Sequence, residues 1–131
     1  MCVEREREFE VMRIASLMMA IAAMLCASSS YAYDDDTTFT CRATSFYVLN
    51  DDTIFQLSGA EFFTIKLRGQ KAFFDNDGYF RNSVNDVVFN YAQVLEVRGV
   101  TSHFKLKDGQ FWYAMAAMGH AVIGQGRCSE L

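Results

Sequence analysis

The chain contains no proline, and no segment rich in serine or glycine long enough to join separately folded domains. Nothing in the sequence therefore marks an internal domain boundary. Histidine is also scarce: His103 and His120 are the only two, and their spacing matches no metal-binding motif. A P-loop, a dinucleotide fingerprint and a Gly-x-Ser-x-Gly motif are all missing. With none of these signatures, we expect neither a cofactor nor a metal.

Strong charge of either sign is lacking as well. The chain has 12 Lys and Arg against 16 Asp and Glu, a formal net charge of -4. A protein that binds nucleic acid through its phosphates needs a clear excess of basic residues. We therefore expect no nucleic-acid partner.

The longest apolar run, Ile14–Ala27, is shorter than the ~20 residues that a transmembrane helix requires. Small residues follow it, with Ser30 and Ala32 at the -3 and -1 positions of a secretory cleavage site. The pattern predicts a cleavable signal helix over residues 1–32 and a single exported domain over 33–131, periplasmic or extracellular. We expect no transmembrane segment in that exported chain.

The start of the signal is unusual because four glutamates precede the apolar run. Translation from Met12 would place the basic Arg13 at the tip, as signal peptides prefer. Both starts fit the same cleavage site.

Removal of the signal leaves Cys41 and Cys128 as the cysteines of the exported chain. Two cysteines in an exported domain most simply form one disulfide. The bridge would close nearly the whole domain into a loop. Its entropic contribution to stability would be roughly 4.5 kcal/mol.

Aromatic residues and a period of two in hydrophobicity indicate strands. Phe63, Ile65 and Leu67 alternate with polar residues, and Asp108-Gly109 is typical of a type I′ hairpin turn. Gly124 and Gly126 share a strand face with Cys128, which indicates close backbone approach, a bulge or a bend. We expect the following strands: 40–49, 53–57, 63–68, 71–74, 87–91, 94–101, 104–107, 111–114 and 120–128.

The segments between these strands are expected to be turns. Residues 81–86 should form a loop or a short helical turn, residues 59–61 a possible helical turn, and residues 114–118 core packing or a short apolar loop. The predicted fold class is all-β, a small antiparallel barrel or sandwich of about 7–8 short strands.

The candidate binding residues lie on the outward positions of the expected strands. Lys66 and Arg68 share one strand face, Lys105 and Lys107 share another, and Trp112 lies in the densest aromatic cluster. If the two basic strands are neighbours, these cations form one patch that would suit an anionic glycan, a lipid headgroup or an acidic protein surface. Separately, an exposed face of the aromatic cluster would stack on a sugar or anchor a protein partner. The alternative is that the basic residues are solvated outward positions that discourage sheet aggregation.

In outline, the export signal, the single disulfide and the short strands resemble small periplasmic β-barrel proteins such as the C-type lysozyme inhibitors. That family carries a Ser-Gly loop and a Tyr-Trp-x-Lys-Gly segment, from which Ser58-Gly59 and Phe111–Ala114 both depart, so we do not assign the chain to it. We expect a non-catalytic binding module of the cell envelope, whose partner is an envelope protein or a glycan. The resemblance implies the alternative of an inhibitor of a hydrolase such as lysozyme. A further alternative is a small metal-dependent enzyme that uses His103 and His120.

Overall fold

The structure is a computed structural model that describes residues 32–75 and 78–131. The predicted signal helix, with Ser30 of the cleavage site, lies outside the described residues, and Ala32 is the first residue within them. The description below concerns the unit formed by the described residues from Ala32 onward.

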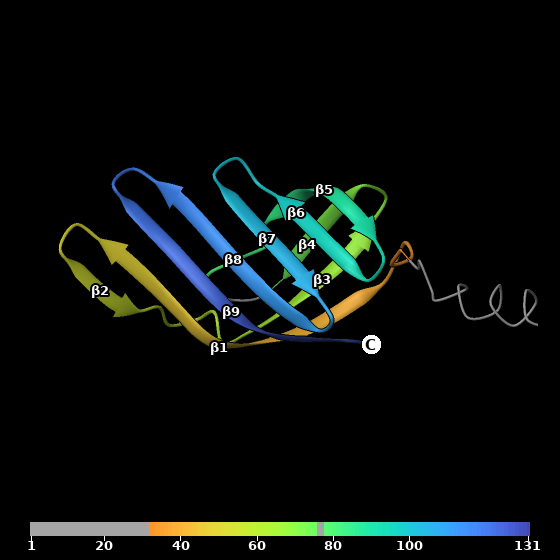
Figure 1. Cartoon of the computed structure of the whole chain (residues 1–131), viewed down its shortest axis with the longest axis horizontal. Helices are drawn as coiled ribbons and strands as arrows, with labels where there is room; N and C mark the ends of the chain where they lie inside the picture. Colours follow the sequence, from red (N-terminus) through yellow and green to blue (C-terminus); the bar gives the residue numbers. More distant parts are fainter. Residues whose placement is uncertain (1–31, 76–77) are drawn as a thin grey trace, which may run out of the picture. The chain divides into compact units, whose positions relative to one another are not determined.

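Among the described residues, antiparallel strands form one continuous sheet (Figure 1). In chain order the strands are β1 (Thr38–Asn50), β2 (Thr53–Gln56), β3 (Phe62–Arg68), β4 (Lys71–Asp75), β5 (Val84–Tyr91), β6 (Val94–Arg98), β7 (Ser102–Lys107), β8 (Gln110–Ala117) and β9 (His120–Glu130). The order β1-β3-β4-β5-β6-β7-β8-β9 closes into a barrel because β9 also pairs with β1, while β2 is an additional strand at the edge of β1. The all-β prediction is confirmed, and the architecture is a barrel.

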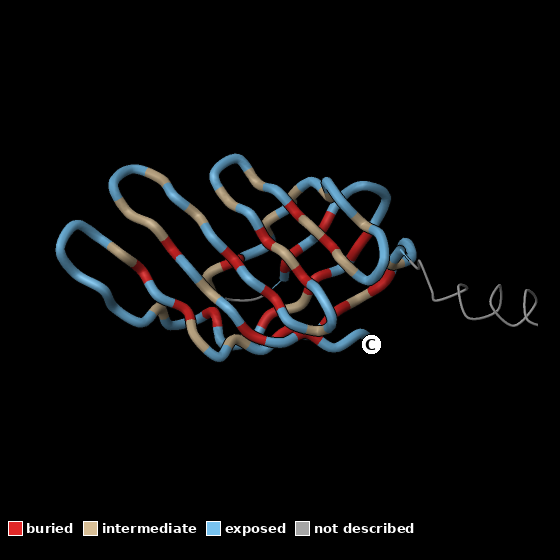
Figure 2. Tube along the Cα trace, in the orientation of Figure 1, coloured by how far each residue is buried: buried red, intermediate tan, exposed pale blue. Residues whose placement is uncertain are grey.

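Buried residues alternate with exposed ones along most of the barrel strands (Figure 2), and their side chains form the core. Strand β5 has no buried residue and contributes only the partly buried Val87. The largest fully buried rings belong to Phe74, Phe104 and Phe111. The Phe104 ring contacts both of the others, with centroids 5.5 Å from Phe74 and 5.4 Å from Phe111. The hairpins between the strands follow the expected turns, and Asp108 and Gly109 both adopt the positive φ of a type I′ turn.

Strand β1 contains a bulge that changes which residues face the core. Its register against β9 shifts between Ala43 and Ser45, so Cys41 points inward before the shift and Phe46 after it. Gly126 lies opposite the bulge, where an added Cβ would come 2.1 Å from the carbonyl oxygen of Arg42. The close approach predicted from the alternate glycines is confirmed.

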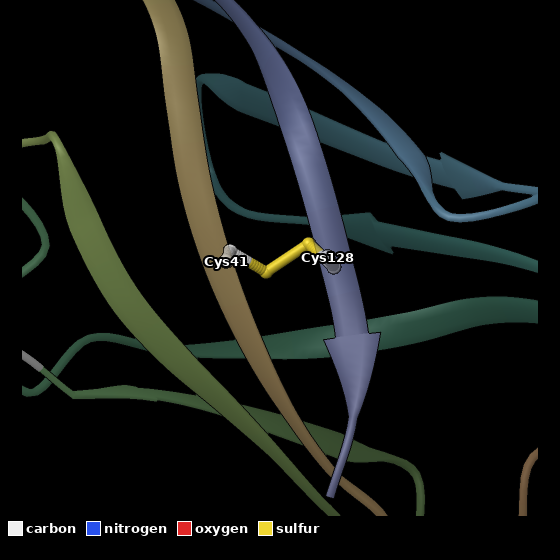
Figure 3. The surroundings of a disulfide bond; sticks show 2 residues. All are labelled: Cys41 and Cys128. Atoms are coloured by element: carbon white, nitrogen blue, oxygen red, sulfur yellow. A yellow bond between two sulfur atoms is a disulfide. The ribbon is translucent and has the colours of Figure 1, made fainter.

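The disulfide joins the first barrel strand to the last. Cys41 of β1 and Cys128 of β9 are direct cross-strand partners, bonded with an S–S distance of 2.01 Å (Figure 3). The predicted pairing is confirmed, and a buried disulfide is typical of proteins from oxidising compartments.

Strands β1, β8 and β9 continue beyond the closed part of the barrel as a ribbon, at the left of Figure 1. The first part of β1, up to Arg42, pairs with β3, whereas Tyr47–Asn50 pair with β2. Each of these long strands therefore contributes one end to the barrel and the other to the ribbon.

Two local predictions are wrong. Asn85 and Asp86 belong to β5, where Asp86 pairs with Lys71 of β4 and so does not interrupt the ladder. Residues 59–61 form a loop without a helical turn.

Of the two alternatives for residues 114–118, core packing holds for Met115, which packs against the core. No apolar loop forms before Met118, because β8 continues past its predicted end at Ala114 to Ala117, paired with β9.

Strand β6 ends at Arg98, before the predicted end at Thr101. A tight turn follows Arg98, closed by a hydrogen bond from Gly99 N–H to the Ser102 carbonyl oxygen, and leads into β7. In the part of the chain that the structure describes, no helix is long and apolar enough to cross a membrane.

Candidate functional site

The outer face of β8, β9 and β1 carries an open groove of about 420 Å³, which we call the outer groove. Its position depends on the outward-facing residues of three adjacent strands. The lining residues are Ser45, Tyr47, Trp112, Tyr113, Ile123, Gly124 and Gln125.

The strand register explains the arrangement of the side chains in the groove. Ile123 is the direct partner of Tyr47, and Trp112 is the direct partner of Gln125 on the same outward face. The indole and phenol rings therefore lie on either side of Ile123. Trp112 is 43% exposed, Tyr47 39% and Ile123 50%, so each offers a substantial apolar surface to a ligand.

The floor of the groove is supported by buried aromatic side chains. An added Cβ on Gly124 would lie 2.2 Å from the Phe46 ring, so the glycine allows that ring to pass directly beneath β9. Phe46 also stacks on Tyr113, with ring centroids 5.5 Å apart. The groove therefore lies on closely packed strands.

A tyrosine pair closes the interior below this floor. The hydroxyl oxygens of Tyr79 and Tyr113 are 3.0 Å apart, and the Tyr79 hydroxyl also contacts Met115 Sδ at 3.3 Å. Burial raises the pKa of Tyr79 and raises that of Tyr113 well above its usual range. Both hydroxyls therefore remain neutral, and the interior here carries no phenolate.

A charged cluster borders the groove on β7 and β6. Lys105, the cross-strand neighbour of Trp112, has its Nζ 2.9 Å from Glu96 Oε1, and His103 Nε2 lies 3.5 Å from Glu96 Oε2. The hydrogen bond from Lys105 lowers the pKa of Glu96, partly opposed by desolvation and assisted by the charges of Lys105 and His103. The Lys105 charge beside the groove is thus balanced by a carboxylate.

The predicted basic residues do not form one patch. Lys66 and Arg68 lie on β3, each 3.7 Å from Asp36. Three strands separate β3 from β7 in either direction around the barrel, so Lys66 and Arg68 face away from Lys105 and Lys107. Of the five candidate binding residues, Trp112 lines the outer groove and Lys105 borders it.

The two histidines are on opposite faces of the sheet. His103 points outward on β7 towards Glu96, whereas His120, at the start of β9, shares the inward-facing register of Val122 and Gly124. Within residues 32–75 and 78–131, no group of three or more His, Cys, Asp or Glu side chains is arranged to hold a metal ion.

Six of the seven groove residues were not predicted as binding residues: Ser45, Tyr47, Tyr113, Ile123, Gly124 and Gln125. Ile123 and Gln125 lie on the face of the 120–128 strand opposite to its glycines, a signal that was available. Tyr47 and Ser45 follow the β1 bulge, which reverses the alternation set by Phe39 and Cys41. A simple period of two therefore could not place them.

A second hollow, of about 560 Å³, lies between the tips of the β1–β2 and β8–β9 hairpins. Asp51 and His120 are its titratable side chains, and alanines make up much of the rest. None of the described residues that line it is aromatic.

Comparison of the chain with protein-family profiles, with curated proteins and with solved structures finds no match.

Proposed function

We propose that this chain is an exported, non-catalytic binding module of the cell envelope, and that its outer groove binds a glycan. The observation that carries the proposal is the groove itself, in which two half-exposed aromatic rings flank an aliphatic floor. Rings of this kind stack on the apolar faces of sugars and remain exposed at little conformational cost.

The polar residues of the groove support a neutral ligand. Ser45 and Gln125 provide a hydroxyl and an amide that both donate and accept hydrogen bonds, which suits the hydroxyl groups of a sugar. Among the described residues, no Asp, Glu, Lys or Arg lines the groove. Lys105, the cross-strand neighbour of Trp112, is held by Glu96. An uncharged oligosaccharide segment therefore fits this surface better than a polyanion.

The predicted location also supports an oligosaccharide as the ligand. The predicted signal over residues 1–32 and the Cys41–Cys128 disulfide both suit an oxidising, extracytoplasmic compartment, where structural polysaccharides are abundant.

Trp112 is the only tryptophan of the chain, so its fluorescence reports on the outer groove. We expect neutral cell-wall oligosaccharides to shift its emission to shorter wavelength as the indole becomes covered. Isothermal titration should show affinity reduced roughly fivefold in Tyr47→Ala, and at least as much in Trp112→Ala, because each loses a stacking ring worth about 1 kcal/mol.

Tyr91→Ala is the matched control, because Tyr91 is an exposed aromatic on β5, away from the groove. It should bind as the unmodified protein does. Loss of binding in Tyr91→Ala, or no response to any oligosaccharide of the panel, would contradict the proposal. Binding of an envelope protein that depends on Trp112, without binding of any oligosaccharide, would overturn the assignment of a glycan.

A further inference from the structure

Strand β2 leaves one edge of the sheet unpaired within the part of the chain that the structure describes. It pairs with β1 on one side and is the last strand in the sheet order on the other. All four of its residues are exposed, including Ile54 at 70% and Phe55 at 48%. Such an edge is a ready template for another strand.

The hydrogen bonds of the β1–β2 pair show which backbone groups are available. Leu57 N–H donates to the Phe46 carbonyl oxygen at 2.8 Å, so residue 57 occupies a hydrogen-bonded position opposite β1. These positions recur at every second residue of an antiparallel pair. Phe55 therefore bonds towards β1, while the N–H and C=O groups of Ile54 and Gln56 point away from it.

This spacing is complementary to itself. In an antiparallel pair of two β2 strands related by a two-fold axis at Phe55, Ile54 lies opposite Gln56 of the second copy. The backbone N–H and C=O groups of both residues point towards the other copy. Ile54 and Gln56 therefore form a hydrogen-bonded pair, in which each N–H donates to the carbonyl oxygen of the other residue. Phe55 then faces Phe55 of the second copy in a non-hydrogen-bonded pair, where side chains are closest.

Charge favours the same register. Strand β2 itself, Thr53–Gln56, carries no charged side chain, and the acidic residues Asp51 and Asp52 precede it at the hairpin tip. With the axis at Phe55, Asp52 is level with Ser58 of the second copy. Shifts of the axis towards the hairpin tip would bring the carboxylates of the two copies together, which is unfavourable.

From this complementarity we infer that β2 is a dimerisation strand, whose partner is β2 of a second copy of this chain. The dimer joins two barrels through one continuous sheet and covers the Phe55 rings. No residue of β2 lines the outer groove, although Gln56 is the cross-strand partner of Tyr47, and the inference is argued from the β2 edge without the glycan proposal.

Cysteine cross-linking tests both the contact and its register. In a Cys2→Ser, Cys26→Ser background, Phe55→Cys places the two new thiols opposite each other at the axis, within reach of a disulfide. We expect mild oxidation to give covalent dimer in roughly tenfold greater yield than for Ile54→Cys, whose partner is Gln56. Ile54 is the more exposed residue, so random collision would favour it instead.

Analytical ultracentrifugation supplies the second measurement. The unmodified chain should show a dimer fraction that rises with concentration. Gln56→Pro should be monomeric with an unchanged circular dichroism spectrum, because proline removes an outward N–H and leaves the bonds to β1 intact. A chain that stays monomeric at every concentration, or equal cross-linking of Ile54→Cys and Phe55→Cys, would overturn the inference.

Discussion

At the scale of single residues, the surroundings of Trp112 are set by the ionic cluster beside it. Glu96 accepts a hydrogen bond from Lys105, which lies directly across from it on β7. It also approaches His103, which lies diagonally on β7, opposite Arg98. Partly exposed ion pairs contribute little to stability. The cluster nevertheless holds the Lys105 ammonium group beside Glu96, so that the carboxylate balances its positive charge next to the groove.

The first prediction concerns the titration of Glu96. Its pKa should lie below the ordinary value of 4.5, because Lys105 stabilises the carboxylate. The stabilisation is present above the pKa of the unfolded chain and is lost as the pH falls through the lower, folded value. Carbon-detected NMR titration should show the Glu96 pKa rising towards 4.5 in Lys105→Met.

Lys107→Met, two residues along the same outward face of β7, is the control and should leave the Glu96 pKa unchanged. If Lys105→Met has no effect on that titration, the hydrogen bond to Lys105 is not its cause.

At the scale of elements, the packing of β9 on β1 depends on glycine. Gly124 faces the Phe46 ring and Gly126 faces the backbone of the β1 bulge, and in both places a Cβ would overlap its neighbour. Because these two positions lack a side chain, β9 can pack closely against the Phe46 ring and against the β1 bulge.

The second prediction follows from that contact. Gly124→Ala should lower the free energy of unfolding by roughly 1–3 kcal/mol, because its methyl group collides with the Phe46 ring. Phe46→Leu should lower it as well, since it opens a buried space. In Phe46→Leu, however, the alanine has room, so the double variant should be more stable than the sum of the single effects predicts.

Urea denaturation of the unmodified protein, the two single variants and the double variant measures the coupling free energy between Gly124 and Phe46. Strictly additive effects would show that Gly124 is not required by the ring beneath it.

At the scale of the whole molecule, the barrel closes where its first and last strands meet. β1 and β9 form the most extended pairing of the sheet, and the Cys41–Cys128 disulfide spans 87 residues across that seam. The disulfide therefore restrains most of the unit from Ala32 to Leu131 in the unfolded state.

The third prediction is that Cys41→Ala, Cys128→Ala lowers the free energy of unfolding by roughly 4.5 kcal/mol, chiefly because the unfolded chain gains entropy. The measurement is urea denaturation of the variant against the oxidised protein. Reduction of the unmodified protein by a thiol reagent should give a comparable loss. A difference below about 1 kcal/mol would show that closure of the barrel does not depend on the bridge.

Sequence patterns predicted most of the elements because each one depends on local chemistry. Alternation over Phe63–Leu67 and the Asp108-Gly109 turn each specify their own structure without distant contacts. Predictions failed where a distant partner decided. Asp86 remains in a strand opposite Lys71, and β8 runs past its predicted end at Ala114 because β9 continues beside it.

By itself, the sequence determined the all-β class, the strand positions and the pairing of the two cysteines, because these follow from periodicity, turn residues and the cysteine count. Only the tertiary structure decided that the sheet closes as a barrel, that Lys66 and Lys105 are on separate walls, and that Tyr47 joins Trp112 in one groove. Strand order and the β1 bulge control those outcomes. Both arise from pairing between residues far apart in the chain, which no local pattern records.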